Sequence, residues 1–347
     1  MRLAARLIAL PISAPEVPLR IRVQVVVVII ASLLTGALLA QRRPPAGQSR
    51  NPPYAAGYGL PEPRLFGEGI ISTGDTELNA AFTPDGTTLY FSKRTPRLQF
   101  WAIVVSSFQQ GAWRTPEVAT FSGQHNDVDP FVSPDGSKLL FISSRSGQTR
   151  GDYDIWIVDR LPSGWGTPRH VPAPVNTESQ EYYPTVSLDG TLYFSSTRAG
   201  GSGRGDLYRS KLIDGRYEEP ENLGPTVNSE FFDGDPFIAP DQSYLIFASY
   251  GRPDGLGDGD LYISYQRNGG WTKPVNLGST INSSALEFCP IVSPDGRYLF
   301  FTSERGFADQ PQPRRLNYSQ LVRQIRSPRN GLGDIYQIDI SRLPGPP

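Results

Sequence analysis

The sequence predicts an all-β protein, a five-bladed β-propeller of four-stranded blades, on three observations. One short motif recurs five times, four strand-like runs follow one another within each repeat, and the strand that the last repeat lacks is present near the N-terminus. The chain of 347 residues also contains 35 glycines and 33 prolines, which imply frequent turns. Its 11% aromatic content implies packed segments between those turns, as in an all-β domain.

The recurring motif predicts a β-hairpin. Each copy places a Pro-Asp-Gly turn, or a close variant, between two apolar runs such as PFVS and KLLFISS. Proline suits position i+1 of a type I turn, and aspartate and glycine suit the positions after it, so each copy predicts two paired strands. Successive turn aspartates are 50, 54, 52 and 54 residues apart. They are Asp85, Asp135, Asp189, Asp241 and Asp295.

Two further strand-like elements complete each repeat. A third run, of the type GDLY, follows a Gly-rich gap, and a fourth element begins with an aromatic residue and a proline. Four short strands in a unit of about fifty residues are typical of a propeller blade, which must stack on its neighbours to bury both of its faces. The aromatic and proline pairs are Trp113 with Pro116, Trp165 with Pro168, Tyr217 with Pro220 and Trp271 with Pro274.

The two ends of the repeat array complement each other. The last repeat ends at Leu343, just after its third strand. Residues 63–67, PRLFG, match the fourth-strand segments PENLG at 220–224 and PVNLG at 274–278. We therefore expect the N-terminal segment to supply the outer strand of the last blade, which closes the ring without open sheet edges.

These motifs carry a family resemblance. The pattern SPDGxxLxFxSxR followed by GDLY resembles the WD-type propeller repeat of the TolB family. The fuller pattern, with WxxPxxLG and with VN before each acid, resembles repeats of bacterial exported and envelope proteins. The resemblance covers residues 60–343 and implies a propeller that serves as an interaction platform, and only sometimes as part of an enzyme. The chain departs from TolB itself, which has six blades and an additional N-terminal domain.

The N-terminal region predicts export. Several arginines in residues 1–22 precede an apolar run at residues 23–40, which indicates a signal peptide cleaved near Ala40 or an uncleaved membrane anchor. The arginines would keep the N-terminus cytoplasmic and send the rest across the membrane. Residues 41–57, rich in Pro, Gly and Ala, predict a flexible linker, and residues 58–347 form the propeller. We expect a periplasmic or extracellular domain, either released or held at the inner membrane by residues 23–40.

The charge balance narrows the choice of partner. Lysines and arginines number 33 against 34 acids, which gives no reason to expect nucleic acid as a partner or a membrane contact beyond the possible anchor. We expect a protein or an envelope glycan as the partner. The single cysteine, Cys289, cannot form an intramolecular disulfide and is predicted to be a small buried hydrophobe.

A recurring acid and arginine frame each predicted hairpin. We expect both to lie at one end of the central channel, as a ring of charges around a funnel. The acids are Glu77, Asp127, Glu181, Asp233 and Glu287. The arginines are Arg94, Arg145, Arg198 and Arg305, with Arg252 two positions beyond the expected site.

The charge ring has two interpretations. Carboxylates in a funnel could bind a cation or a sugar, or serve in glycoside hydrolysis. Alternatively, the acids pair with the arginines and hold the blades together. A catalytic site needs carboxylates in different environments, whereas these acids are equivalent, so we predict a structural role.

Other candidate chemistry is weak. The spaced acids Asp254, Asp258 and Asp260 could suggest calcium, but they lack the ligand run and terminal glutamate of an EF-hand loop, and turn hydrogen bonds explain them. His125 and His170 occupy non-equivalent positions without metal-ligand spacing. The sequence contains no GxSxG elbow and no phosphate loop. We predict no catalytic residue, metal or cofactor.

An insertion breaks the fifth repeat. From Arg305 to Asp334 is 29 positions, and the segment includes NYSQLVRQIR, which could form a short helix with Leu321 and Ile325 on one side. Insertions in repeat proteins tend to lie on the binding face, although a solvated loop is the alternative. The first repeat is also irregular near RTPRLQFWAIVV. The predicted binding residues are Arg314, Arg315, Arg323, Arg326, Lys93 and Trp101.

The sequence thus predicts an exported, non-catalytic propeller that binds a protein or an envelope ligand. The alternative is a carbohydrate-active enzyme, either a glycoside hydrolase or a polysaccharide lyase. It would use a subset of Asp127, Glu181, Asp233 and Glu287.

Overall fold

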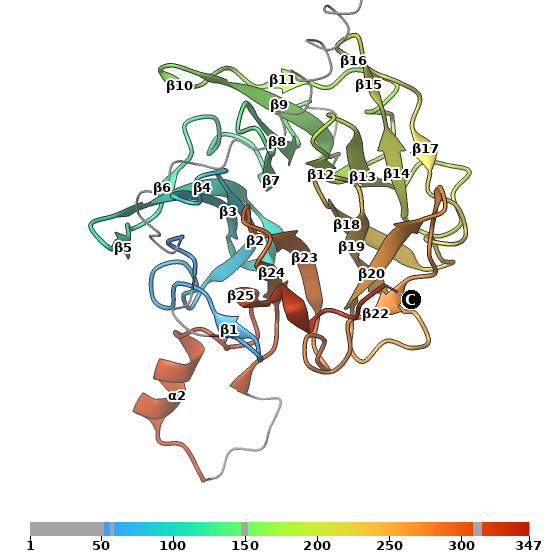
Figure 1. Ribbon diagram of the computed structural model, residues 1–347. Coiled ribbons are helices and arrows are strands. Elements are labelled where there is room, and N and C mark those ends of the chain that lie inside the picture. Colours follow the sequence, from blue (N-terminus) through green and yellow to red (C-terminus); the bar gives the residue numbers. More distant parts are fainter. Residues whose placement is uncertain (1–51, 56–58, 147–151, 308–313, 347) are drawn as a thin grey trace, which may run out of the picture. The chain divides into compact units, whose positions relative to one another are not determined.

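The structure, a computed structural model, describes residues 52–55, 59–146, 152–307 and 314–346 (Figure 1). The prediction of an all-β five-bladed propeller is confirmed, with antiparallel sheets arranged as blades around a central channel. The predicted export signal lies outside the described residues. Within the described part of the chain, no helix has the length and apolar character needed to cross a bilayer.

In blades 1 to 4 the strands follow chain order from the channel outward, whereas in blade 5 the N-terminal strand β1 is the outermost one. Blade 1 contains β2 (Thr76–Phe82), β3 (Thr88–Arg94), β4 (Trp101–Gln109), β5 (Ala112–Trp113) and β6 (Glu117–Val118). Blade 2 contains β7 (Asp127–Val132), β8 (Lys138–Ser143), β9 (Asp154–Leu161), β10 (Gly164–Trp165) and β11 (Arg169–His170). Blade 3 contains β12 (Glu181–Val186), β13 (Leu192–Ser196), β14 (Asp206–Ser210) and β17 (Glu221–Asn222), with the hairpin β15 (Leu212–Ile213) and β16 (Arg216–Tyr217). Blade 4 contains β18 (Phe232–Ile238), β19 (Tyr244–Tyr250), β20 (Asp260–Arg267), β21 (Gly270–Trp271) and β22 (Val275–Asn276). Blade 5 contains β23 (Glu287–Val292), β24 (Tyr298–Ser303), β25 (Asp334–Asp339) and β1 (Arg64–Leu65).

The Pro-Asp-Gly segments form the hairpin turns that the motif predicts. In blade 2 the Asp135 carboxylate accepts hydrogen bonds from the Ser133 hydroxyl at 2.6 Å and from the Ser137 N–H at 3.0 Å. Gly136 follows at φ 71°, a conformation that glycine adopts without steric cost. The Ser133 hydroxyl is the main reason why the pKa of Asp135 is lowered. The turn is therefore held by its own side chains.

The ring closes as the sequence predicts, by pairing of β1 with β25. Arg64 lies opposite Gln337 and Leu65 opposite Tyr336, so the N-terminal segment forms the outer strand of blade 5. The next residue, Phe66, is buried at this closure. β1 therefore covers the outer edge of β25 along this segment.

Tyr54, which falls within the predicted linker of residues 41–57, packs against the propeller. It is 3% exposed, and its ring lies 5.0 Å from Phe82 and 6.1 Å from Phe300 between ring centroids. The rest of the predicted linker, apart from residues 52, 53 and 55, lies outside the described residues. The aromatic ring of Tyr54 therefore contributes buried apolar surface between blades 1 and 5.

Every innermost strand contains a β-bulge. The strand register shifts one to four positions after the ring acid, as between Val128 and Phe131 in blade 2. A bulge re-aims side chains that simple alternation would send to the other face. The bulged residue in each blade has a left-handed φ between 48° and 61°. These residues are Asn79, Asp129, Tyr183, Asp235 and Cys289.

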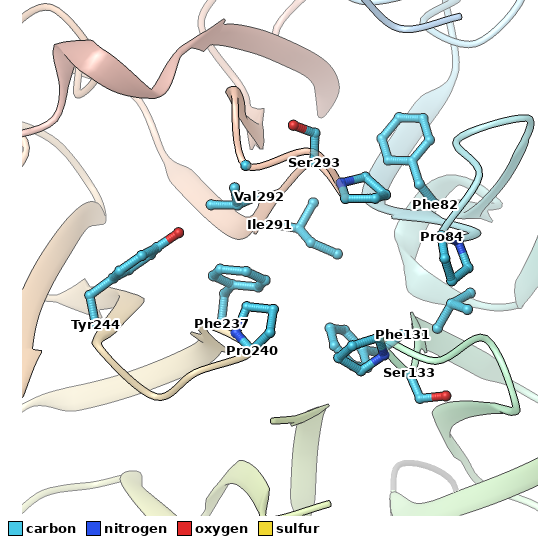
Figure 2. Close-up of a pocket in the computed structure, with 14 residues that line it drawn as sticks. Phe82, Pro84, Phe131, Ser133, Phe237, Pro240, Tyr244, Ile291, Val292 and Ser293 are labelled. Carbon is cyan, nitrogen blue, oxygen red and sulfur yellow. The ribbon is translucent and has the colours of Figure 1, made fainter. Parts of the chain in front are cut away.

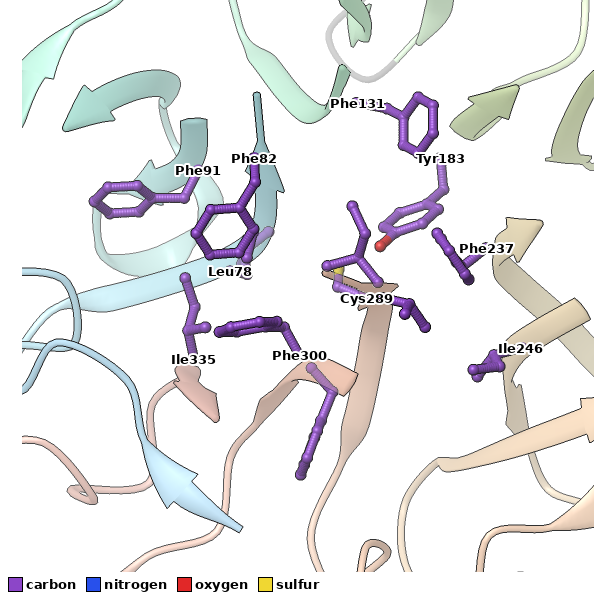
Figure 3. Packing of buried hydrophobic residues seen from close by; sticks show 14 of the residues in the cluster. Leu78, Phe82, Phe91, Phe131, Tyr183, Phe237, Ile246, Cys289, Phe300 and Ile335 are labelled. Carbon is purple, nitrogen blue, oxygen red and sulfur yellow. The ribbon is translucent and has the colours of Figure 1, made fainter. Parts of the chain in front are cut away.

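Side chains close the channel midway. Figure 3 shows Phe82, Phe131 and Phe237 among the apolar residues packed around the axis. The Tyr183 hydroxyl crosses from blade 3 to blade 5, where it donates a 2.8 Å hydrogen bond to the carbonyl of Pro290. The channel is therefore divided into two separate hollows, one at each end.

Candidate functional site

The five ring acids are fully buried, and each is held by donors of its own blade. In blade 4, Asp233 accepts hydrogen bonds from the Ser229 N–H at 2.6 Å and from the Ser249 hydroxyl at 2.6 Å. Arg252 adds a charged hydrogen bond at 2.8 Å. All five acids have 0% exposure, so none of them faces the funnel. Their place in the structure is inside the blade, between the strand and the incoming connector.

The partly buried arginines join each of these blades to the connector that arrives from the preceding blade. Arg252 also donates to the carbonyl of Val227, in the connector that arrives from blade 3. Its guanidinium lies over the rings of Phe247 and Tyr262 at 5.3 and 5.0 Å. The same arrangement of acid, arginine and connector carbonyl recurs in three other blades. The pairs are Arg145 with Asp127, Arg198 with Glu181, and Arg305 with Glu287.

Blade 1 departs from the predicted pairing by one residue. Lys93 contacts Glu77 at 2.8 Å and Asp75 at 2.9 Å, so Lys93 has the place in blade 1 that an arginine has in the other blades. Arg94, expected in the ring, instead contacts Glu304 of blade 5 at 3.6 Å. Residues 93 and 94 point in opposite directions on the strand, and the lysine is the one that faces Glu77.

An aromatic hollow lies at the channel end where the innermost strands begin. We call it the channel mouth, and its volume is about 250 Å³. Every blade contributes an aromatic side chain, and the remaining lining is aliphatic except for Asp129, Asp235 and Cys289. The aromatic residues are Trp101, Tyr153, Tyr182, Phe232, Tyr250 and Phe288. The aliphatic residues are Leu78, Val128 and Ile142.

The aromatic lining arises from positions that differ between repeats. The residue after the ring acid is Tyr182 in blade 3 and Phe288 in blade 5, whereas blade 4 has Gly234 there. A Cβ on Gly234 would lie 2.7 Å from the Phe232 ring, so the glycine makes room for that ring. Blade 4 has Tyr250 as an additional residue, which places Arg252 later in its repeat than the other arginines. Arg252 nevertheless contacts Asp233. The lining of the channel mouth therefore differs from blade to blade, although the blades themselves are nearly symmetric.

Three of the bulged residues, Asp129, Asp235 and Cys289, form the floor of the channel mouth. The Asp235 carboxylate accepts a hydrogen bond from the Cys289 N–H at 3.2 Å, and the carboxylate of Asp129 accepts one from the Tyr183 N–H. Asn79, which does not line the hollow, donates to Asp129 at 3.5 Å. Its own carbonyl oxygen is buried and has no hydrogen-bond partner among the described residues. The floor therefore presents two carboxylates to the hollow.

The pKa values of the two floor carboxyls are raised. Burial raises the pKa of Asp129 well above its usual range, and the nearby charge of Asp235 adds to the effect. Burial also raises the pKa of Asp235, to about 6. Asp235 is partly accessible, whereas Asp129 is 9% exposed. Near neutral pH the floor therefore carries its negative charge chiefly on Asp235.

Replacing Asp235 with asparagine should stabilise the protein increasingly, relative to the wild type, as pH rises. The unfolded aspartate loses its proton near 3.8 and the folded one near 6, so the wild type loses stability between these values while asparagine does not. At ~1.4 kcal/mol per pKa unit, the gain is about 1 to 3 kcal/mol. Urea unfolding of both proteins across this pH window measures it. A stability difference that does not change with pH would contradict the perturbed carboxyl.

The predicted binding residues do not gather in one place. Trp101 lines the channel mouth, where the guanidinium of Arg94 lies 5.2 Å from its ring centroid. The insertion forms α2 (Tyr318–Ile325), with Asn317 and Gln320 as a capping box, and projects clear of the blades in Figure 1. Its anchor is Asn330, which donates to the carbonyl of Gly74 at 3.0 Å. The arginines of the insertion are solvent-exposed and do not line the mouth. They are Arg314, Arg315, Arg323 and Arg326.

The remaining candidates have local partners. His170 contacts Asp154 at 3.0 Å, and His125 is exposed on a connector. The Asp260 carboxylate accepts a 3.0 Å hydrogen bond from the Asn276 amide, and Tyr262 donates to Asp254 at 3.0 Å. Over the described residues, no group of three or more His, Cys, Asp or Glu side chains has metal-binding geometry.

A second hollow lies at the turn end of the channel and has a different character (Figure 2). Its volume is about 170 Å³, and prolines of the hairpin turns and apolar residues line it. Ser133 and Ser293 also line it, but each donates its hydroxyl to the aspartate of its own turn. No acidic or basic side chain is among the described residues that line this hollow, so the channel mouth is the better candidate site.

The chain has no match among protein-family models, and none among curated proteins. Solved structures similar to it include TolB from Acinetobacter baumannii, with 17% identity over 78% of this chain and 55% of that chain, at a TM-score of 0.45. The alpha-L-arabinofuranosidase PaAbf62A from Podospora anserina in complex with cellotriose has 12% identity over 81% and 94% of the two chains, with a TM-score of 0.45. The Bacteroides ovatus xyloglucan PUL GH43B has 13% identity over 78% and 53%, with a TM-score of 0.44. The chain therefore spans about half the length of two of these proteins.

Proposed function

We propose that this protein is an exported, non-catalytic β-propeller that binds its ligand in the channel mouth. The observation that carries the proposal is the convergence of aromatic side chains from all five blades on one hollow with a carboxylate floor. Concave sites with aromatic walls and a few oriented polar groups are the usual form of ligand pockets. Export rests on the arginines and the apolar run of residues 1–40, and cell fractionation of the full chain tests it.

The size of the hollow limits what can enter. At about 250 Å³ it admits a small molecule, one sugar unit or a single protruding side chain of a partner. Aromatic rings suit this task because they supply contact area at a small entropy cost. The ligand is therefore either a small envelope compound or a group that a larger partner presents.

The hydrogen bonds of the floor favour binding over catalysis. Each carboxylate already accepts a backbone N–H of the next blade's bulge, which fixes its position and uses part of its capacity. The ring acids are sealed inside the blades and cannot reach a substrate. The site can therefore recognise a ligand through preorganised groups without a free general acid and base in the ring.

Replacing Tyr182 with alanine should weaken any ligand of the mouth at least tenfold, because a wall of the hollow is lost. Tyr318→Ala, on the exposed α2, is the matched control and should leave affinity unchanged. Calorimetric titration with a panel of oligosaccharides, amines and peptides measures both. If the Tyr318 variant loses binding and the Tyr182 variant keeps it, the insertion carries the function instead.

A carbohydrate-active enzyme remains the second candidate, and one observation favours it. Asp129 and Asp235 have unequal environments, and such pairs can divide into acid and base roles. Product analysis of a glycan panel decides between the two proposals. We expect no product, whereas release of sugars that is abolished by Asp235→Asn would establish the enzyme.

A further inference from the structure

The channel mouth has an unbalanced charge. Two carboxyl groups, Asp129 and Asp235, lie in its floor, and no lysine or arginine is among the described residues that line it. Burial of acids beside each other is costly without a compensating cation. The structural acids of this protein show the contrast, since each of them has its own arginine or lysine.

The cations near the rim are already engaged. Arg94 lies over the ring of Trp101 and contacts Glu304 at 3.6 Å. Lys93 lies between Glu77 and Asp75 at 2.8 and 2.9 Å. Neither side chain pairs with Asp129 or Asp235, so the negative charge that Asp235 carries near neutral pH is open to a cation from outside the chain.

A third acceptor lies beside the two acids. The side-chain oxygen of Asn79, a residue 2% exposed, has no hydrogen-bond partner among the described residues. Its amide nitrogen is directed to Asp129 at 3.5 Å. Buried acceptors are normally satisfied, so this oxygen is an unusual feature next to Asp129. The carboxyl groups that do line the floor, those of Asp129 and Asp235, favour a ligand with hydrogen-bond donors and positive charge.

The walls suit the same type of ligand. The faces of tyrosine, phenylalanine and tryptophan rings attract cations, and a cage of aromatic rings is a known way to bind alkylammonium groups. Tyr153 and Tyr182 lie 6.1 Å apart between centroids, and Phe232 and Tyr250 lie 5.6 Å apart in an edge-on arrangement. Aromatic pairs thus border the hollow on blades 2, 3 and 4.

We propose that the ligand of the channel mouth is an organic cation. Its ammonium or guanidinium group would face Asp235 and Asp129, and its hydrocarbon part would contact the aromatic walls. This inference rests on the proposed function, because it names the ligand class of the same site.

The affinity for such a cation should depend on pH through Asp235. The titratable groups that face it are Asp129 on β7, Tyr183 on β12, Tyr250 on β19 and Cys289 on β23, with Glu304 beyond Tyr250. Burial raises the pKa of Tyr183, Tyr250 and Cys289, so these groups stay neutral. With the pKa of Asp235 at about 6, affinity should rise about tenfold from pH 5 to pH 7.5.

The test compares cations with neutral molecules of the same shape. Choline and n-butylamine are titrated into the full chain by calorimetry, beside 3,3-dimethylbutan-1-ol and n-butanol. We expect at least one cation to bind, its neutral counterpart to bind at least tenfold more weakly, and Asp235→Asn to lower the cation affinity at least tenfold. Asp258→Asn, an exposed acid in the β19–β20 loop, is the matched control and should change the affinity less than twofold.

The outcomes separate this inference from the proposed function. Absence of cation binding, equal binding of the neutral counterparts, or undiminished binding by the Asp235 variant would overturn the cation inference. If maltotriose or xylotriose binds instead and Tyr182→Ala abolishes that binding, the mouth remains the ligand site and only its ligand class is wrong. If every ligand found is insensitive to Tyr182→Ala, the proposed function fails as well.

Discussion

Replacing Asp233 with alanine is expected to destabilise the protein by about 3 to 5 kcal/mol, the usual cost of removing one partner of a buried ion pair. The variant leaves the Arg252 guanidinium buried without its charge partner. It also leaves the Ser229 N–H and the Ser249 hydroxyl without their acceptor. Equilibrium unfolding in urea measures the loss.

Two further variants test whether the loss of stability comes from the Asp233–Arg252 ion pair. Asp258→Ala removes an exposed acid from the same blade and should change stability by no more than about 0.5 kcal/mol. Replacing both Asp233 and Arg252 by apolar residues should cost less than the sum of the single replacements, because no buried charge remains unpaired. Strict additivity, or a loss below about 1 kcal/mol for Asp233→Ala, would contradict a structural role of the ring.

Replacing Phe66 with alanine is expected to cost about 3 to 5 kcal/mol, the range for removal of a buried aromatic ring. The Phe66 ring lies 5.1 Å from Phe300 and 5.8 Å from Trp113 between centroids, so it joins blade 5 to blade 1 at the ring closure. Thermal and urea unfolding measure the effect. Val118→Ala, at an exposed position on β6, is the control and should be nearly neutral. If Phe66→Ala is equally neutral, the N-terminal strand does not hold the ring closed.

The fold was predictable because its signals are local. A Pro-Asp-Gly turn fixes a hairpin through its own backbone and side-chain preferences, and the structure of the Asp135 turn shows these bonds directly. The ring closure was predictable from the match between residues 63–67 and the outer strands of other repeats. Repetition strengthened both signals, since each was present several times.

The channel mouth was not predicted, because a β-bulge has no clear composition signal. Asp129 and Asp235 adopt a left-handed φ that aspartate tolerates, but Tyr183 and Cys289 adopt it too. Simple alternation would place these residues on the same face as the ring acid, inside the blade. One signal was available. The ring position is acidic in every repeat, whereas the position two residues later carries four different residue types: Asn79, Asp129, Tyr183, Asp235 and Cys289.

For the insertion, the sequence predicted the helix but did not decide whether its arginines bind a ligand. The short helix with Leu321 and Ile325 is present as α2, and both side chains are exposed. A role for its arginines in binding stays a prediction, because they lie apart from the channel mouth. Trp101 is the one predicted binding residue that lines the site.

The carboxyl carbon resonance of Asp235 reports directly on whether an external cation binds beside this residue. Titration by nuclear magnetic resonance, with Asp235→Asn for assignment, should give a midpoint near 6 for the free protein, because burial raises the pKa of Asp235. Saturating choline or n-butylamine should move that midpoint to lower pH, since a bound cation stabilises the carboxylate. A midpoint near the ordinary value of 3.8 that neither cation moves would contradict cation binding beside a buried Asp235.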